Sequence, residues 1–170
     1  MSHRGPDSLN SLVLDNNIRL GHVRLSVIDT NERSNQPFWS QSKRYVMVFN
    51  GEIYNYMEIA KKHNINIKTK SDTEILIELY VLLGKEMLSH LNGMFSIVIF
   101  DTTSGSIFVA RDRLGIKPLY YSIKGDEIII SSEIAPILQL MDTVEFDDIG
   151  IRQYKKDRKS TRLNSSHTSI

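Results

Sequence analysis

The chain has 170 residues, which is enough for one domain with a substantial core. It carries 21 basic and 20 acidic residues, a net charge of +1, and no cysteine. These values exclude disulfides, thiolate metal sites and a cysteine nucleophile within the chain. No apolar run approaches the roughly 20 residues that span a bilayer. Only one acid accompanies the six basic residues from Arg152 onward, so the rest is mildly acidic and offers no basic stripe for a nucleic acid. We expect a cytoplasmic protein without a membrane or nucleic-acid partner.

The first half of the chain predicts two strands and two helices. Residues 18–28 and 43–49 are rich in β-branched and aliphatic side chains, and the second strand should stop at the turn signal Asn50-Gly51. One helix is expected over residues 54–62 and a clearer one over 71–83. The apolar face of the clearer helix is formed by Ile75, Leu76, Leu79, Leu82 and Leu83. Its start, with Ser71 and Glu74, fits a capping box.

The second half predicts two hairpins and a short helix. The hairpins pair residues 94–100 with 106–111 and residues 120–123 with 127–132, each across a polar turn. A helix is expected over residues 133–140, although Pro136 falls in its first turn. Runs of strands joined by turns indicate an antiparallel α+β fold rather than a doubly wound α/β fold.

The last residues, 155–170, differ from the rest. They lack apolar periodicity and are rich in serine, threonine and charge, so we expect them to be disordered and a spurious extension of the chain. A basic interaction tail is the functional alternative. The expected domain therefore covers residues 1–154.

Three features could bind a small polar ligand, and each has an ordinary structural alternative. Arg24 could hold a carboxylate in two parallel bonds, or could lay its stem along a sheet edge. Asn50 and Gly51 could donate to a developing oxyanion, or simply form a turn. Asp72 could bind an ammonium group, or complement a helix dipole.

Five strings of the sequence, taken together, resemble a known family. They are His3-Arg4-Gly5-Pro6-Asp7, Gly21-His22-Val23-Arg24-Leu25-Ser26, Asn50-Gly51-Glu52-Ile53-Tyr54-Asn55, Ser71-Asp72-Thr73-Glu74 and Ala110-Arg111-Asp112-Arg113-Leu114-Gly115-Ile116-Lys117-Pro118-Leu119-Tyr120-Tyr121. In this order they resemble the glutaminase domain of class II glutamine amidotransferases, most closely that of glutamine-hydrolysing asparagine synthetases. The resemblance implies a four-layer αββα antiparallel sandwich of the N-terminal-nucleophile type.

The resemblance also implies roles for individual residues. Arg24 would hold the glutamine carboxylate and Asp72 its ammonium group, while Asn50 and Gly51 form the oxyanion hole. The remaining glutamine contacts would come from Leu25, Ser26, Val27, Ile28 and Glu52. These residues must then converge on one site. The string at residues 110–121 is expected to form a buried ion-pair network without a catalytic role.

Two departures from the family pattern stand out. The family's nucleophile is an N-terminal Cys on a strand that precedes the His-Arg-Gly-Pro-Asp loop, whereas here that loop follows Met1 directly. The family also continues into an ATP-binding synthetase domain, and its Ser-Gly-Gly-type loop is absent from this sequence. We therefore expect a fragment that lacks its first strand and is inactive by itself.

The function implied for the whole enzyme is asparagine synthesis. Glutamine hydrolysis would release ammonia, which amidates ATP-activated aspartate in a synthetase domain of the same chain. No cofactor or metal is expected in the present domain, since ATP and magnesium belong to the synthetase domain, and the full-length enzyme could be a homodimer. The alternatives are a non-catalytic glutamine-binding or regulatory module, or the glutaminase domain of another amidotransferase.

Overall fold

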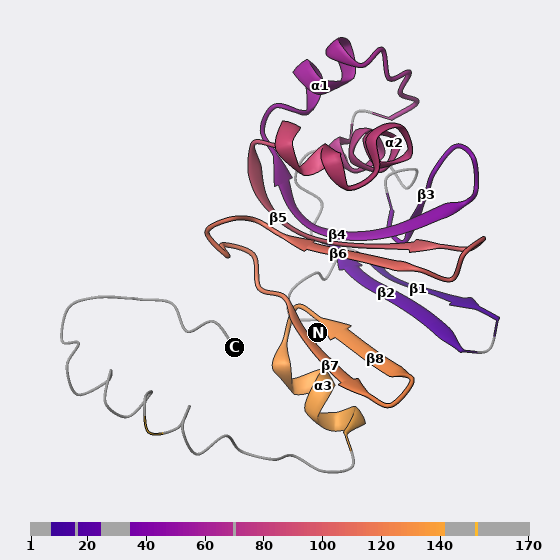
Figure 1. Cartoon of the computed structure of the whole chain (residues 1–170), viewed down its shortest axis with the longest axis vertical. Coiled ribbons are helices and arrows are strands. Elements are labelled where there is room, and N and C mark those ends of the chain that lie inside the picture. The colour runs from indigo at the N-terminus through magenta and orange to yellow at the C-terminus, as the bar shows by residue number, and fades with distance from the viewer. Residues whose placement is uncertain (1–7, 16, 25–34, 70, 142–151, 153–170) are drawn as a thin grey trace. The chain divides into compact units, whose positions relative to one another are not determined.

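The computed structural model describes residues 8–15, 17–24, 35–69, 71–141 and 152 (Figure 1). The chain divides into two compact units, Met1–Glu133 and Ile134–Ile170. The strands of the described residues form three antiparallel sheets, with orders β1-β2, β3-β4-β5-β6 and β7-β8. Helices occur alongside these sheets, so the predicted α+β class is confirmed.

The four-stranded sheet is the centre of the first unit. Its strands are β3 (Phe38–Trp39), β4 (Tyr45–Ile53), β5 (Gly93–Asp101) and β6 (Ile107–Arg111). The longest ladder joins β4 to β5 and runs from the pair Tyr45↔Asp101 at one end to Ile53↔Gly93 at the other. The two ends of this ladder have different chemistry, which matters below.

Three helical segments accompany this sheet: α1 (Tyr56–Lys62), α2 (Asp72–Leu83) and the 3₁₀ helix η3 (Gly84–His90). Figure 1 shows α1 and α2 over one face of the sheet. The core between α2 and the sheet contains fully buried side chains from both, among them Met47, Ile97, Ile75, Leu76 and Leu79. Alternate residues of β4 therefore face the helices. The others, including Val48, Asn50 and Glu52, face the opposite side.

The apolar face predicted for α2 is only partly correct. Ile75, Leu76 and Leu79 are buried as expected, but Leu82 is 56% exposed and Ile77 is completely buried. The first two turns of the helix are enclosed on a wide arc, because every residue from Asp72 to Ile77 is buried. A single helical stripe cannot describe a helix that is enclosed at one end and exposed at the other.

The predicted capping box at the start of α2 is half correct. Ser71 caps the helix, since its side chain accepts from the backbone N–H of Thr73 at 3.2 Å. Glu74 is buried but holds the preceding loop instead, accepting from the backbone N–H groups of Lys68 at 2.9 Å and Thr69 at 2.7 Å. The carboxylate thus fixes the chain that leads into Ser71 and Asp72.

The remaining described elements are two hairpins and one helix. They are β1 (Ser8–Leu14) with β2 (Ile18–Arg24), β7 (Tyr120–Lys124) with β8 (Glu127–Ser131), and α3 (Ile134–Leu140) in the second unit. The predicted hairpins and α3 are confirmed, while β1, β3 and η3 were not predicted. Residues 155–170 lie outside the described residues. Among the helices of the described residues, none has the length and apolarity needed to cross a membrane.

Candidate active site

Strand β4 does not end at Asn50-Gly51, so the predicted stop is wrong. The strand continues to Ile53, and Asn50 and Gly51 pair with Ser96 and Phe95 of β5. A Cβ at Gly51 would meet the Met94 carbonyl oxygen and lie 2.7 Å from Phe95 Cα. Glycine is required here because the two strands approach closely, not because the backbone turns.

Strand β3 pairs only with Val46 and Met47 of β4, so the same edge of β4 from Phe49 to Ile53 presents backbone groups to other partners. The Phe49 N–H donates to Gln36 Oε1 at 2.5 Å, and the Ile53 N–H donates to Asp72 Oδ2 at 3.1 Å. Backbone groups alternate sides along a strand, so the N–H of Gly51 points to the same edge, between these two. No described residue takes up this N–H at the edge. The Gly51 N–H is thus a donor that lies between two N–H groups already bonded to side chains.

Asp72 lies at this edge as a buried carboxylate. It occupies the first turn of α2 and is only 5% exposed. Burial raises its pKa, as does the charge of the nearby Glu52, while hydrogen bonds from the backbone of Ile53 and Thr73 oppose the rise. Glu52 thus lies near enough for its charge to act on Asp72, and among the residues whose side chains the structure describes, no cation forms an ion pair with either carboxylate. This is the electrostatic environment that an ammonium group would relieve.

The other predicted site residues are only partly located. Arg24 is the last residue of β2, where it pairs with Ser8, and β2 contacts β4. Leu25, Ser26, Val27 and Ile28 lie outside the described residues. The structure therefore brings Asp72 to the strand that carries Asn50, Gly51 and Glu52, through its contact with Ile53 and the charge of Glu52, whereas the position of the Arg24 guanidinium relative to them stays a prediction.

The string at residues 110–121 is not an ion-pair network, which corrects the prediction. The buried Asp112 carboxylate accepts from the backbone N–H groups of Phe95, Ile116 and Lys117 at 2.8–3.2 Å. Burial raises the pKa of Asp112, but these backbone hydrogen bonds outweigh burial and hold it below its ordinary value. Arg111 donates to the Gly115 and Lys117 carbonyls. Both side chains satisfy backbone groups of a tight loop, so the string fixes a backbone conformation.

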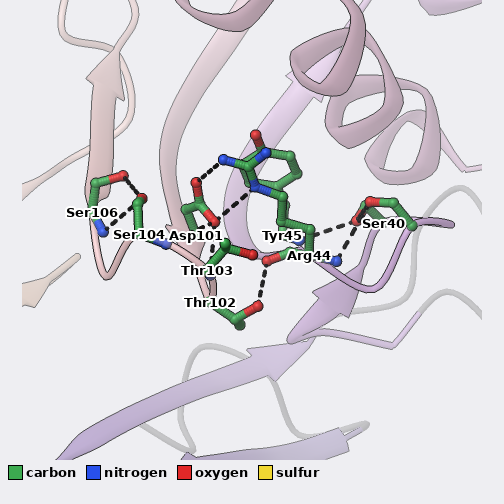
Figure 2. Close-up of polar contacts among 9 residues, drawn as sticks. Ser40, Arg44, Tyr45, Asp101, Thr102, Thr103, Ser104 and Ser106 are labelled. Atoms are coloured by element: carbon green, nitrogen blue, oxygen red, sulfur yellow. Dashed lines mark hydrogen bonds and ion pairs between the residues drawn. The ribbon is translucent and has the colours of Figure 1, made fainter.

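The far end of the β4–β5 ladder has a different arrangement (Figure 2). Arg44 binds Asp101 in two parallel bonds, Nη2 to Oδ2 at 2.6 Å and Nε to Oδ1 at 2.9 Å. Asp101 also accepts from the backbone N–H of Thr103 at 2.9 Å. The Arg44 guanidinium is the main reason that the pKa of Asp101 lies well below its usual range. This end is a closed structural turn with its charges paired.

Sequence reasoning missed Gln36. This buried side chain accepts from the Phe49 N–H and donates to the Phe49 carbonyl at 3.0 Å, next to Gly51 on the same edge. The available signal was a polar residue followed by Pro37 just before a short strand, and it is weak because such pairs are common in loops. Among the described residues, no group of three His, Asp or Glu side chains could hold a metal ion.

Comparison with known proteins identifies the family of the chain. A family model for the glutamine amidotransferase domain matches residues 1–170. A putative glutamine-hydrolysing asparagine synthetase 2 of Methanocaldococcus jannaschii is 37% identical over 88% of this chain and 32% of its own length. Glutamine-hydrolysing asparagine synthetase 1 of Bacillus subtilis is 38% identical over 89% of this chain and 24% of its own. The chain thus spans about a quarter to a third of these relatives.

A solved structure supports the fold. Glutamine phosphoribosylpyrophosphate amidotransferase from B. subtilis, complexed with ADP and GMP, matches 69% of this chain and 28% of its own, with a TM-score of 0.57 and 29% identity. Its agreement with the antiparallel α+β arrangement confirms the predicted fold type. The family model, the relatives and the fold together show that the chain belongs to the glutamine amidotransferase domain family, matching the glutaminase halves of asparagine synthetases.

Proposed function

We propose that this domain binds L-glutamine at the edge of β4, as the glutaminase part of an asparagine synthetase-like amidotransferase. The observation that carries this proposal is the Gly51 N–H, which lies between two occupied donors and beside the paired carboxylates of Glu52 and Asp72. In this proposal, the side-chain amide oxygen of glutamine accepts from Gly51 and from the Asn50 amide. Donors fixed in this way stabilise the negative charge that develops during amide cleavage.

The ends of the ligand are recognised by opposite charges. The ammonium group binds Asp72 and Glu52, which relieves the repulsion between two buried or half-buried carboxylates. The carboxylate binds Arg24, assisted by residues 25–28. Relatives that are named as glutamine-hydrolysing asparagine synthetases support glutamine as the ligand. Transfer of the released ammonia to aspartate would take place in a synthetase domain, with ATP and magnesium.

This chain by itself should bind glutamine without hydrolysing it. Class II amidotransferases, which the sequence resembles, form a covalent intermediate on a cysteine, and the 170 residues contain none. An oxyanion hole without its nucleophile leaves only a residual rate. The expected result with purified protein is saturable glutamine binding and no ammonia release above the uncatalysed background.

Isothermal titration calorimetry tests this proposal. L-Glutamine should bind, whereas D-glutamine should bind at least about tenfold more weakly, because its ammonium and carboxylate cannot reach Asp72 and Arg24 together. Equal binding of the two enantiomers, or none of either by folded protein, would reject the site. Ammonia release by the same protein would reject its inactivity while leaving the site in place.

A further inference from the structure

The Gln36 side chain completes the edge of β4 in place of a backbone strand. The β3–β4 register pairs Phe38 with Met47 and Trp39 with Val46, which places Gln36 opposite Phe49. The residue between Gln36 and Phe38 is Pro37; it lies opposite Val48 in this register, where the backbone groups point away from β4. The carboxamide of Gln36 bonds to both the N–H and the C=O of Phe49. One side chain thus imitates one rung of an antiparallel ladder.

This rung lies immediately before the donor that the proposed function uses. Phe49 and Gly51 are alternate residues on the same edge, and Asn50 lies between them. Gln36 is 7% exposed, so its two hydrogen bonds are shielded from water and hold Phe49 in a defined position. Asp72 fixes Ile53 on the other side. The Gly51 N–H is therefore held from both sides, by Gln36 and by Asp72.

We propose that Gln36 is a positioning residue for amide recognition, which aims the Gly51 N–H and the Asn50 side chain at the glutamine carboxamide without touching it. The inference rests on the proposed function. Gln36 lies on the Asn50 side of Gly51, whereas the ammonium site at Asp72 lies on the Ile53 side. Loss of Gln36 should therefore weaken recognition of the side-chain amide and leave recognition of the ammonium group largely intact.

The test compares two ligands that differ only at the amide. L-Norvaline carries a methyl group where L-glutamine carries its carboxamide, so the ratio of their dissociation constants measures amide recognition alone. In Gln36→Met, the preference for glutamine should fall about tenfold, because Phe49 loses both of its partners. A purely structural defect would weaken both ligands equally and leave the ratio unchanged.

Two further variants make the test decisive. Gln36→Glu retains an acceptor for the Phe49 N–H but places a carboxylate against the Phe49 carbonyl. Its preference for glutamine over norvaline should therefore also fall. If Gln36→Met does not fold, the result with Gln36→Glu decides whether Gln36 positions the site. Gln41→Met is the matched control, because Gln41 Nε2 donates to the Asn66 carbonyl at 2.9 Å in an exposed position away from Gly51. Its preference should equal that of the wild type.

The amide resonance of Gly51 in ¹⁵N spectra provides a reading that does not need glutamine. It should shift in the free Gln36 variants and stay in place in Gln41→Met. An unshifted resonance, or an unchanged preference in folded Gln36 variants, would overturn the positioning role. If the resonance shifts but the wild type binds no glutamine, the proposed function fails while the effect of Gln36 on Gly51 stands.

Discussion

A buried aspartate lies at each end of the β4–β5 ladder, and the pKa values of the two are shifted in opposite directions. At one end Arg44 neutralises Asp101, and the pKa of Asp101 is lowered. At the other end Asp72 faces burial and the charge of Glu52, and its pKa is raised. A paired charge stabilises a fold, whereas Asp72 has no cation partner among the side chains that the structure describes, and such a charge is a candidate for binding a ligand. In the proposed function, the Asp101 end serves structure and the Asp72 end serves binding.

The largest expected effect comes from Gly51→Ala. The new Cβ would meet backbone atoms of β5, so the strands must separate, and we expect a loss of about 3 kcal/mol in the free energy of unfolding. Gly105, near Asp101, is the matched control: its φ is +72° and no atom lies within 4 Å of a Cβ there. Gly105→Ala should cost about 1–2 kcal/mol, the strain of a side chain at positive φ. Urea unfolding measures both, and similar losses would contradict the close approach at Gly51.

Asp72→Asn should separate binding from folding. The asparagine oxygen can still accept from the Ile53 N–H, but the charge for the ammonium group is lost. We expect glutamine affinity to fall about 10- to 100-fold, as for hydrogen bonds to charged groups. Calorimetry measures the affinity and urea unfolding confirms that the variant is folded. Asp101→Asn is the control, with lower stability and unchanged glutamine affinity. Unchanged affinity in folded Asp72→Asn would contradict the ammonium site.

Acid should affect the two aspartates in opposite directions. The pKa of Asp72 is raised, so its ionised form opposes folding above that pKa, and the wild type should gain stability relative to Asp72→Asn as the pH falls through it. The pKa of Asp101 is lowered, so its contribution is present above the ordinary value of 3.8 and disappears as the pH falls below it. Urea unfolding from neutral to acid pH measures both differences. If the stability difference from the wild type changed with pH in the same way for Asp72→Asn and Asp101→Asn, the contrast between the two aspartates would be disproved.

The smallest expected effect belongs to Arg44→Lys. The lysine keeps the charge but loses the two parallel bonds to Asp101, and the Arg44 side chain is 47% exposed, so water screens much of the interaction. Thermal unfolding should show a slight loss of stability that shrinks further in high salt. A loss as large as that in Gly51→Ala would mean that the turn at Asp101 is more important than its exposure indicates.

Most of the fold could be predicted from the sequence because its signals are local. Turns at residues 101–105 and 124–126, and the apolar pattern of residues 71–83, define elements without knowledge of distant contacts. The continuation of β4 through Asn50-Gly51 could not be predicted in this way. There Gly51 is selected by the proximity of Phe95, a residue 44 positions away on another strand, and a local rule interprets the pair as a turn.

The candidate site shows the same division. The resemblance assigned Asp72 and residues 50–52 to one site, and in the structure Asp72 binds the backbone of Ile53, the next residue of the same strand; their joint role in binding stays a prediction. A resemblance carries information about distant contacts that composition and periodicity lack. The resemblance did not reveal Gln36 or the role of Asp112. Both side chains lie outside strands and bond to backbone groups of a strand distant in sequence, and the residue type alone does not reveal such a partner.

Mapping of ¹⁵N amide shifts during an L-glutamine titration tests the central claim most directly, because it reports on both ends of the ladder at once. We expect saturable shifts at Gly51, Ile53 and the start of α2, with the resonances of Asp101 and Thr103 unmoved. Shifts centred on the Asp101 turn, or a saturable binding signal that leaves Gly51 and Ile53 unchanged, would contradict the assignment of glutamine to this edge of β4.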